Sequence, residues 1–182
     1  MSIKETELGI LASFQRLLER HWYDEISLDA VAEGAGTTRQ TIVRRFDGKA
    51  ALLGEFAQRI AREIEASRGE PPRDDPAAAA AAVVTDYETS GDMVMRLAAL
   101  QQRSHEVAAA VDAGRLAHTR WVERAFESDL RAFDDAERTD RLSALLVATD
   151  VRAWFLLRRA QKRTRAETMR VMTAMIARTL QI

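Results

Sequence analysis

The chain has 182 residues and a mass of 20.4 kDa, enough for one large domain or for a small domain joined to a larger one. It has only 8 glycines and 3 prolines and no cysteine, which excludes a collagen-like repeat, a disulfide framework, thiolate metal sites and a cysteine nucleophile. With 27 basic and 28 acidic residues the net charge is −1, so any affinity for nucleic acid must come from a local patch.

The sequence also argues against a membrane span and against export. The longest apolar run is the eight residues 77–84, which is too short to cross a bilayer. Glu5 and Glu7 lie near the amino terminus, where a secretory or transit peptide would be basic and poor in acid. Together with the lack of cysteine, these features predict a cytoplasmic protein.

Apolar periodicity predicts four helices before a break at residues 68–75. The break contains Gly69, Pro71 and Pro72, through which a helix cannot continue. Capping residues mark several helix starts, among them Ser27 and Thr38. The four helices are expected at residues 5–20, from Ser27 to Gly34–Gly36, from Thr38 to Phe46, and from Asp47 or Lys49 to about Ser67.

After the break the pattern is again helical, beginning with Asp75 as the N-cap of a helix that starts at Pro76. No strand alternation is present. Segments are expected at about 76–90, 92–104, 105–113, 115–133, 139–161 and 166–180, separated by Gly91, Gly114 and two charged breaks. The sequence therefore predicts an all-α protein with a helix-turn-helix domain at 1–67, a linker at 68–75 and a larger helical domain at 76–182.

Two of these segments carry more apolar surface than a single chain can easily bury from water. The stretch 142–157 carries apolar side chains nearly all the way round, and the last helix is apolar over a wide arc. We therefore expect a two-fold homodimer formed by these helices. The candidate interface residues are Leu145, Phe155, Met169, Met172 and Ile176.

Residues 27–49 read as helix, glycine turn, helix, which suits a helix-turn-helix. Gly36 supplies the unusual backbone turn. At about 100° per residue, Ile42 and Phe46 define the inward side of the second helix, while Gln40 and Arg44 lie opposite. The second helix is thus expected to present a polar face to solvent.

Positive charge is concentrated on this short helix, since residues 37–49 hold four basic side chains and one acidic side chain. The alternative is that these basic side chains form an ordinary solvent-exposed helix face with no binding role. A helix fits the major groove of DNA, where Arg44 and Gln40 can pair with base edges and hydroxyl or ammonium groups can bind phosphates. The candidate DNA contacts are Ser27, Thr38, Arg39, Gln40, Thr41, Val43, Arg44, Arg45 and Lys49.

Residues 35–53 resemble the DNA-binding domain of the TetR/AcrR family of bacterial transcriptional regulators. The glycine turn, the threonines, Ile42, Phe46 and Lys49 followed by paired leucines occur in phase with that family's pattern. The resemblance implies double-stranded DNA with a palindromic operator as partner, a helical domain that dimerises and binds a small-molecule effector, and most often repression. Two positions depart from the family pattern. Val43 stands where the family usually has a tyrosine that contacts phosphate, and Arg45 stands where an aromatic residue or histidine is common.

The resemblance also implies a ligand pocket in the larger domain, although ordinary core packing explains the same apolar residues. Gln101 and His118 are the polar partners beside it. A second basic cluster, at residues 158–165, is expected to be structural because it lies at a helix carboxy terminus. The candidate pocket residues are Met93, Leu97, Leu100, Gln101, His118, Trp121, Phe126 and Trp154.

An enzymatic function has little support in the sequence. The three histidines show no metal-ligand spacing, and no carboxylate pair or glycine-rich phosphate loop accompanies them, so no catalytic residue, metal or cofactor is expected. The rival hypothesis is a helical dimer that binds a small molecule or a protein partner without sequence-specific DNA binding.

Overall fold

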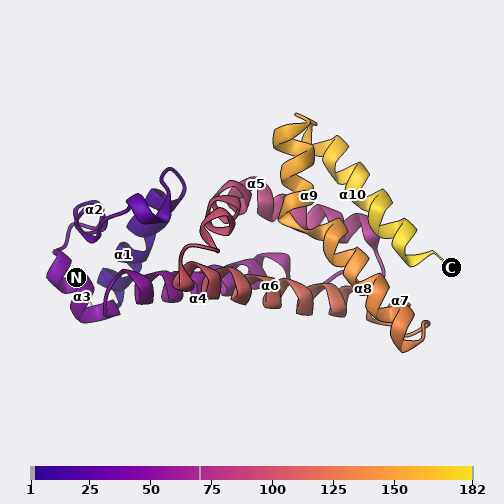
Figure 1. Ribbon diagram of the computed structural model, residues 1–182, viewed down its shortest axis with the longest axis horizontal. Helices are drawn as coiled ribbons and strands as arrows, with labels where there is room; N and C mark the ends of the chain where they lie inside the picture. Colours follow the sequence, from indigo (N-terminus) through magenta and orange to yellow (C-terminus); the bar gives the residue numbers. More distant parts are fainter. Residues whose placement is uncertain (1–2, 70, 182) are drawn as a thin grey trace. The chain divides into compact units, whose positions relative to one another are not determined.

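The computed structural model describes residues 3–69 and 71–181, and within them every regular element is a helix, as the composition predicted (Figure 1). The chain forms two compact units. The first unit is Met1–Glu63 with Arg96–Gly114, and the second unit is Ile64–Met95 with Arg115–Ile182. Residues 1, 2, 70 and 182 of the expected domain ranges lie outside the described residues, and the division into functional domains stays a prediction.

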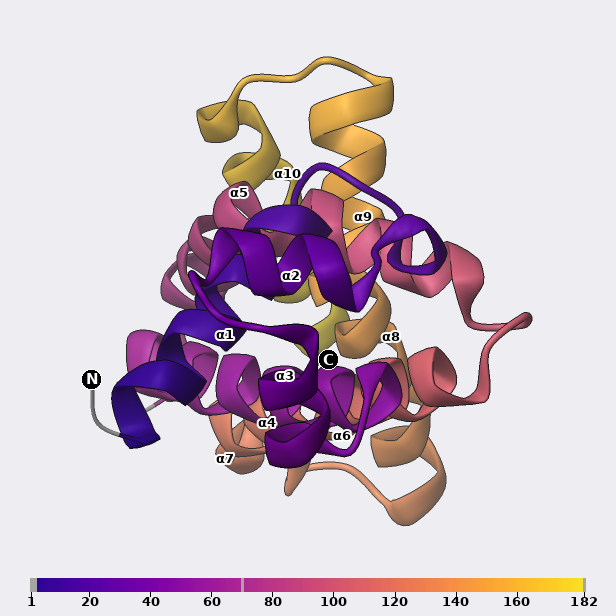
Figure 2. The same ribbon diagram turned by 90° about the vertical axis from the view of Figure 1, so that its left-hand side faces the viewer.

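The first unit is built around the amino-terminal helices. These are α1 (Ile3–Leu18), the 3₁₀ turn η1 (Tyr23–Glu25), α2 (Leu28–Gly34), α3 (Arg39–Phe46) and α4 (Lys49–Arg68), of which the last five residues belong to the second unit. Phe14 of α1 packs edge-on against Phe56 of α4, with ring centroids 5.7 Å apart. Figure 2 shows α1, α2 and α3 in indigo and purple, with η1 in the connection between α1 and α2.

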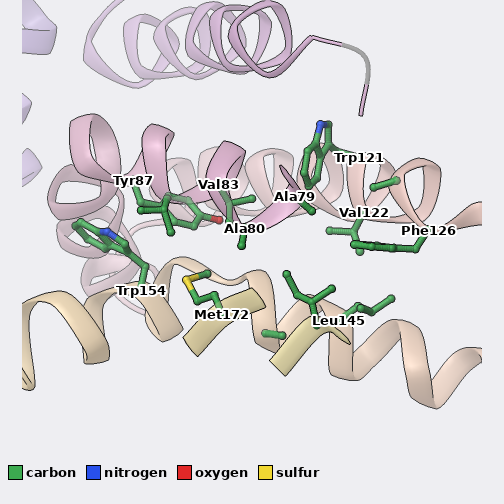
Figure 3. Packing of buried hydrophobic residues seen from close by; sticks show 14 of the residues in the cluster. Ala79, Ala80, Val83, Tyr87, Trp121, Val122, Phe126, Leu145, Trp154 and Met172 are labelled. Atoms are coloured by element: carbon green, nitrogen blue, oxygen red, sulfur yellow. The ribbon is translucent and has the colours of Figure 1, made fainter. Parts of the chain in front are cut away.

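The second unit contains the remaining helices. They are α5 (Pro76–Leu100), α6 (His105–Ala125), α7 (Glu127–Leu130), α8 (Asp135–Thr149), α9 (Val151–Phe155), the π-helical turn η2 (Leu156–Ala160) and α10 (Arg165–Leu180); the end of α5 and the start of α6 belong to the first unit. In Figure 3, side chains from α5 and α6 meet those from α8, α9 and α10 in one apolar layer. Asp75 caps α5 as predicted, since its Oδ1 accepts from the Ala77 and Ala78 amides at 3.0 Å each.

Gly91 and Gly114 do not end helices, contrary to the sequence prediction. Both α5 and α6 run through them. A single glycine costs a helix only about 1 kcal/mol, which packing along a long helix offsets. Gly91 has a packing role instead, because a Cβ there would lie 2.4 Å from the Trp154 ring.

The segment expected at 139–161 is not one helix. Asp150 adopts an extended backbone after α8, and its carboxylate accepts from the Arg152 amide at 2.7 Å, which starts α9. The helix then widens into η2. Likewise the segment expected at 115–133 ends at Ala125 and is followed by the short α7. At Asp150 a single cap redirects the chain without interrupting its apolar periodicity, which explains the wrong prediction for residues 139–161.

Candidate nucleic-acid interface

The α2–α3 pair has the local geometry that the sequence predicted. Ser27 Oγ accepts from the Ala30 amide and Thr38 Oγ1 accepts from the Thr41 amide, each at 3.1 Å, so both hydroxyls cap helix starts. Gly36 has φ +61°, a left-handed conformation that glycine adopts without strain. The turn between the helices is therefore fixed by short-range interactions.

Two residues of α1 hold the end of α2 in place. The Ser13 hydroxyl donates to the Val31 carbonyl at 3.0 Å, and Arg16 donates to the Gly34 carbonyl at 3.0 Å. Gly34 is required here, because a Cβ would lie 2.4 Å from Ser13 Oγ. No sequence signal pointed to Ser13 or Arg16, because their partners lie 18 residues further along the chain.

Helix α3 has one buried side and one exposed side. Ile42 and Phe46 are buried, while Gln40 and Arg44 are exposed and Val43 is 43% exposed. Within the described chain, Arg44 makes no hydrogen bond or ion pair. The guanidinium that the helical phase assigned to a base edge is thus free to reach a ligand.

The other two arginines of α3 are paired with carboxylates. Arg45 lies 3.3 Å from Glu7 of α1, and its side chain is only 20% exposed. Arg39 lies 3.6 Å from Asp29, but both side chains stay largely exposed, so this pair is weak. Arg45 therefore ties α3 to α1, whereas Arg39 remains at the surface.

Lys49 opens α4 and is half-buried against the η1 turn. Its Nζ donates to the Asp24 carbonyl at 3.5 Å and lies 4.3 Å from the centroid of the Tyr23 ring. Burial lowers the pKa of Lys49, while nearby Asp24 and Glu106 act in the opposite direction. The Tyr23 hydroxyl in turn donates to Glu106 Oε1 at 3.4 Å. No sequence signal pointed to Tyr23 or Glu106, which are 83 residues apart.

A capped helix pair with a glycine turn, a buried inner face and an exposed cationic outer face is the architecture of helix-turn-helix DNA-binding proteins. In that class the second helix enters the major groove and its surroundings contact the backbone. Figure 2 shows how the backbone of α3 follows that of α2.

Comparison with known proteins agrees with this class. The family described as "Bacterial regulatory proteins, tetR family" matches residues 10–56. An uncharacterized HTH-type transcriptional regulator of Mycobacterium tuberculosis H37Rv is 46% identical over 52 residues, which are 29% of this chain and 25% of that protein. The HTH-type transcriptional regulator EthR of Mycolicibacterium smegmatis is 47% identical over 49 residues, 27% of this chain and 23% of EthR. Residues 10–56 are therefore similar to the DNA-binding segment of tetR-family regulators.

The match to the curated relatives spans about a quarter of their length. Solved structures extend the likeness in fold to the whole chain. A transcriptional regulator from Rhodococcus sp. Rha1 has a TM-score of 0.72 at 17% identity and covers 100% of this chain and 97% of its own. A tetR-family regulator from Streptomyces coelicolor has a TM-score of 0.67 at 20% identity, covering 99% and 90%. Among the described residues, no helix could span a membrane and no group of side chains could hold a metal ion.

The candidate pocket residues fall in both units. Leu97, Leu100 and Gln101 belong to the first unit, and Met93, His118, Trp121, Phe126 and Trp154 belong to the second. Phe126 and Trp154 are fully buried in the core of the second unit (Figure 3). The Trp121 ring stacks on His118 with centroids 6.4 Å apart, and its indole N–H is buried and has no hydrogen-bond partner among the described residues. The pocket stays a prediction.

His118 belongs to a buried polar cluster that the sequence did not reveal. Its Nδ1 lies 3.2 Å from Arg68, and its Nε2 lies 2.9 Å from the Thr149 hydroxyl. Arg68 also forms a buried ion pair with Asp86. Burial, together with the Arg68 charge, lowers the pKa of His118 to about 4. His118 is therefore neutral at physiological pH.

The candidate dimer residues differ in exposure. Leu145, Met172 and Ile176 are fully buried in the core of the second unit, so they pack the subunit itself. Phe155 and Met169 are partly buried against that core. The same part of the chain instead exposes Val147 (65%), Leu156 (53%) and Met175 (36%). The interface also stays a prediction.

The second basic cluster has partners on α5. Arg158 binds Glu88 through two nitrogens, at 2.6 and 2.9 Å, and Arg159 binds Asp92 in the same manner. Glu88 also accepts from the Trp154 indole at 3.0 Å. These hydrogen bonds from Arg158 and Trp154 lower the pKa of Glu88 to about 2, against the effect of burial. The two arginines join η2 to α5, a more specific role than the expected helix-end effect.

Proposed function

We propose that the protein is a homodimeric DNA-binding transcriptional regulator of the bacterial cytoplasm, a repressor that a small-molecule effector releases from a palindromic operator. The observation that carries the DNA-binding part is the outer face of α3, where Gln40, Val43 and Arg44 are exposed while Ile42 and Phe46 anchor the helix. The tetR-family match over residues 10–56 supports the same function.

The proposed DNA contacts are of two kinds, contacts to base edges and contacts to phosphates. Arg44 pairs with a guanine edge and Gln40 with an adenine edge, because these side chains fit those bases bidentately. Thr41, Arg39 and Lys49 bind phosphates, which position the protein without reading sequence. Ser27 and Thr38 serve first as helix caps, and each hydroxyl retains the capacity for a second hydrogen bond.

The test is binding to a duplex selected by the protein from a random DNA pool. We expect Arg44→Ala to weaken binding to that duplex about five- to hundredfold and to relax the preference at one base pair. The matched control is Arg62→Ala, because Arg62 is an exposed cation about 20 Å further along α4 from Lys49. Equal effects of the two substitutions would show that α3 does not enter the groove.

A two-fold dimer presents two recognition helices one or more helical turns apart, about 34–36 Å per turn, so its operator is a palindrome. Exposed Val147, Leu156 and Met175 support a surface on α8, η2 and α10 of the second unit. Phe155 and Met169 extend this surface where they are partly exposed. A contiguous surface formed by these side chains would favour self-association.

The effector acts by binding one conformation of the dimer better than the other, and its differential affinity sets how far DNA binding falls. The polar cluster around His118 supports a site in the second unit for a ligand that offers an acceptor to the unpartnered Trp121 N–H. Screening small molecules for a rise in melting temperature that Trp121→Phe abolishes tests this assignment.

A further inference from the structure

Lys49 rests in a defined place on the protein itself, although the proposed function requires it at a DNA phosphate. Its ammonium touches the Asp24 carbonyl and the Tyr23 ring, at 3.5 and 4.3 Å. A carbonyl and a ring face are both attractive positions for a cation. A phosphate must therefore compete with this resting place.

The resting place is itself fixed by helix α6. Glu106 lies in the first turn of α6 and accepts a hydrogen bond from the Tyr23 hydroxyl. Tyr23 is buried, so its ring has little freedom to move. Close by in the first unit, Arg96 at the end of α5 donates to the Leu18 carbonyl at 2.8 Å, which holds the α5–α6 connection to α1.

We propose that Glu106 is a restraining counter-charge: through Tyr23 it stabilises the resting place of the Lys49 ammonium and thereby weakens the contact of Lys49 with operator phosphate. This inference rests on the proposed function, because it concerns the same DNA surface. The negative charge of Glu106 favours the cation beside Tyr23, and any carboxylate near a phosphate-binding lysine also opposes the approach of DNA.

The arrangement gives α6 a way to regulate DNA binding. Helix α6 begins in the first unit and continues without a break into the second. A displacement of its first turn that separates Glu106 from Tyr23 frees Lys49 for phosphate. A displacement that brings Glu106 and Tyr23 closer together keeps Lys49 in its resting place.

The alternative is a purely structural role, since an acidic residue in the first turn stabilises any helix through the helix dipole. Glu106→Gln removes the charge on which both roles depend, so the two roles are separated by whether its effect requires Lys49. Glutamine keeps an oxygen that can accept from the Tyr23 hydroxyl, and it removes only the charge. The matched control is Glu33→Gln, which removes one exposed negative charge from α2 of the same unit.

The experiment measures binding of the full chain to its selected duplex by fluorescence anisotropy at several salt concentrations. We expect Glu106→Gln to tighten binding about two- to fivefold, and Glu33→Gln to change it by clearly less. In a Lys49→Gln background the gain from Glu106→Gln should disappear, because no ammonium remains to be released. A structural role would not depend on Lys49.

The inference is overturned if Glu106→Gln weakens binding, if it has the same effect as Glu33→Gln, or if its gain persists without Lys49. Melting curves of all variants identify any that fail to fold; in that case Tyr23→Phe, which removes the hydroxyl but keeps the ring, takes the place of Glu106→Gln with the same expected direction. If the wild-type protein binds no duplex, the proposed function fails and this inference fails with it. Binding that is normal but insensitive to Glu106 overturns only the inference.

Discussion

Arg44 and Arg45 are neighbours in the sequence, yet they have different surroundings. Arg44 is exposed and makes no hydrogen bond or ion pair within the described chain, whereas Arg45 is mostly buried against Glu7. Successive residues on a helix point about 100° apart, which is enough to place one in solvent and the other against α1. Charge alone does not distinguish a DNA contact from a structural ion pair.

Gly91 and Gly114 both lie inside helices but differ in how closely other side chains pack against them. We expect Gly91→Ala to lower the free energy of unfolding by about 1–3 kcal/mol, because the new Cβ overlaps the Trp154 ring. Gly114→Ala should raise it by about 0.5–1 kcal/mol, since nothing lies within 4 Å and alanine favours helix. Urea unfolding of both variants checks the pair. A stabilised Gly91→Ala protein would mean that Trp154 does not pack as described.

The short helices α2 and α3 depend on their caps and on α1. Seven or eight residues are too few for a stable isolated helix, so end interactions matter more here than in α5 or α6. Ser27 and Thr38 cap the starts, and Arg16 binds the end of α2. Helix α3 is therefore positioned by interactions at its ends and by its buried face.

Thr38 allows the capping role to be separated from a phosphate contact. Thr38→Ala removes the cap and should lower the free energy of unfolding by about 1 kcal/mol. Thr38→Asp keeps a capping oxygen and should retain stability, but its charge should repel phosphate and weaken DNA binding. Denaturant titration and anisotropy, done on both variants, check the two roles. Strong DNA binding by Thr38→Asp would place Thr38 away from the backbone.

At the scale of the whole molecule, the second unit combines an apolar layer with buried polar groups. Apolar side chains from the helices α5 to α10 meet in one core, part of which is drawn in Figure 3. The Arg68–Asp86 pair and His118 are buried beside it and satisfy one another. Buried polar groups that depend on each other make stability sensitive to protonation.

The lowered pKa of His118 determines the direction in which stability changes with pH. Its folded pKa of about 4 lies below the ordinary value of 6.5, so the unfolded chain binds the proton more readily. Stability should fall as the pH drops from about 6.5 to about 4, by at most about 3 kcal/mol, and not further from this group below pH 4. Urea unfolding across this range, with His118→Gln as the control, checks it. An equally steep loss in His118→Gln would assign the effect to other groups.

The proposed dimer surface makes a prediction about the assembly. Val147→Asp or Leu156→Asp should convert a dimer to a monomer, because each puts a charge into an apolar contact. Both side chains are exposed in the subunit, so the fold should be retained. The exposed Leu116→Asp on α6 is the control. Light scattering with circular dichroism measures both properties. A wild-type monomer would contradict the surface.

The sequence by itself determined the helical class, the capped α2–α3 pair and the family resemblance. These features depend on periodicity, caps and turns, whose partners lie within three or four residues. The buried face of α3, with Ile42 and Phe46, could be predicted for the same reason. Most candidate DNA residues on α3 were therefore identified from their helical phase.

Only the tertiary structure decided which residues meet across long separations. Gly91, which was expected to end a helix, instead leaves room for the Trp154 ring. Leu145, Met172 and Ile176, which were expected at a dimer interface, are buried inside the subunit. The tertiary structure also connected Lys49 to Glu106 through Tyr23. Contacts between residues tens of positions apart leave no local spacing in the sequence, because they depend on how whole helices pack.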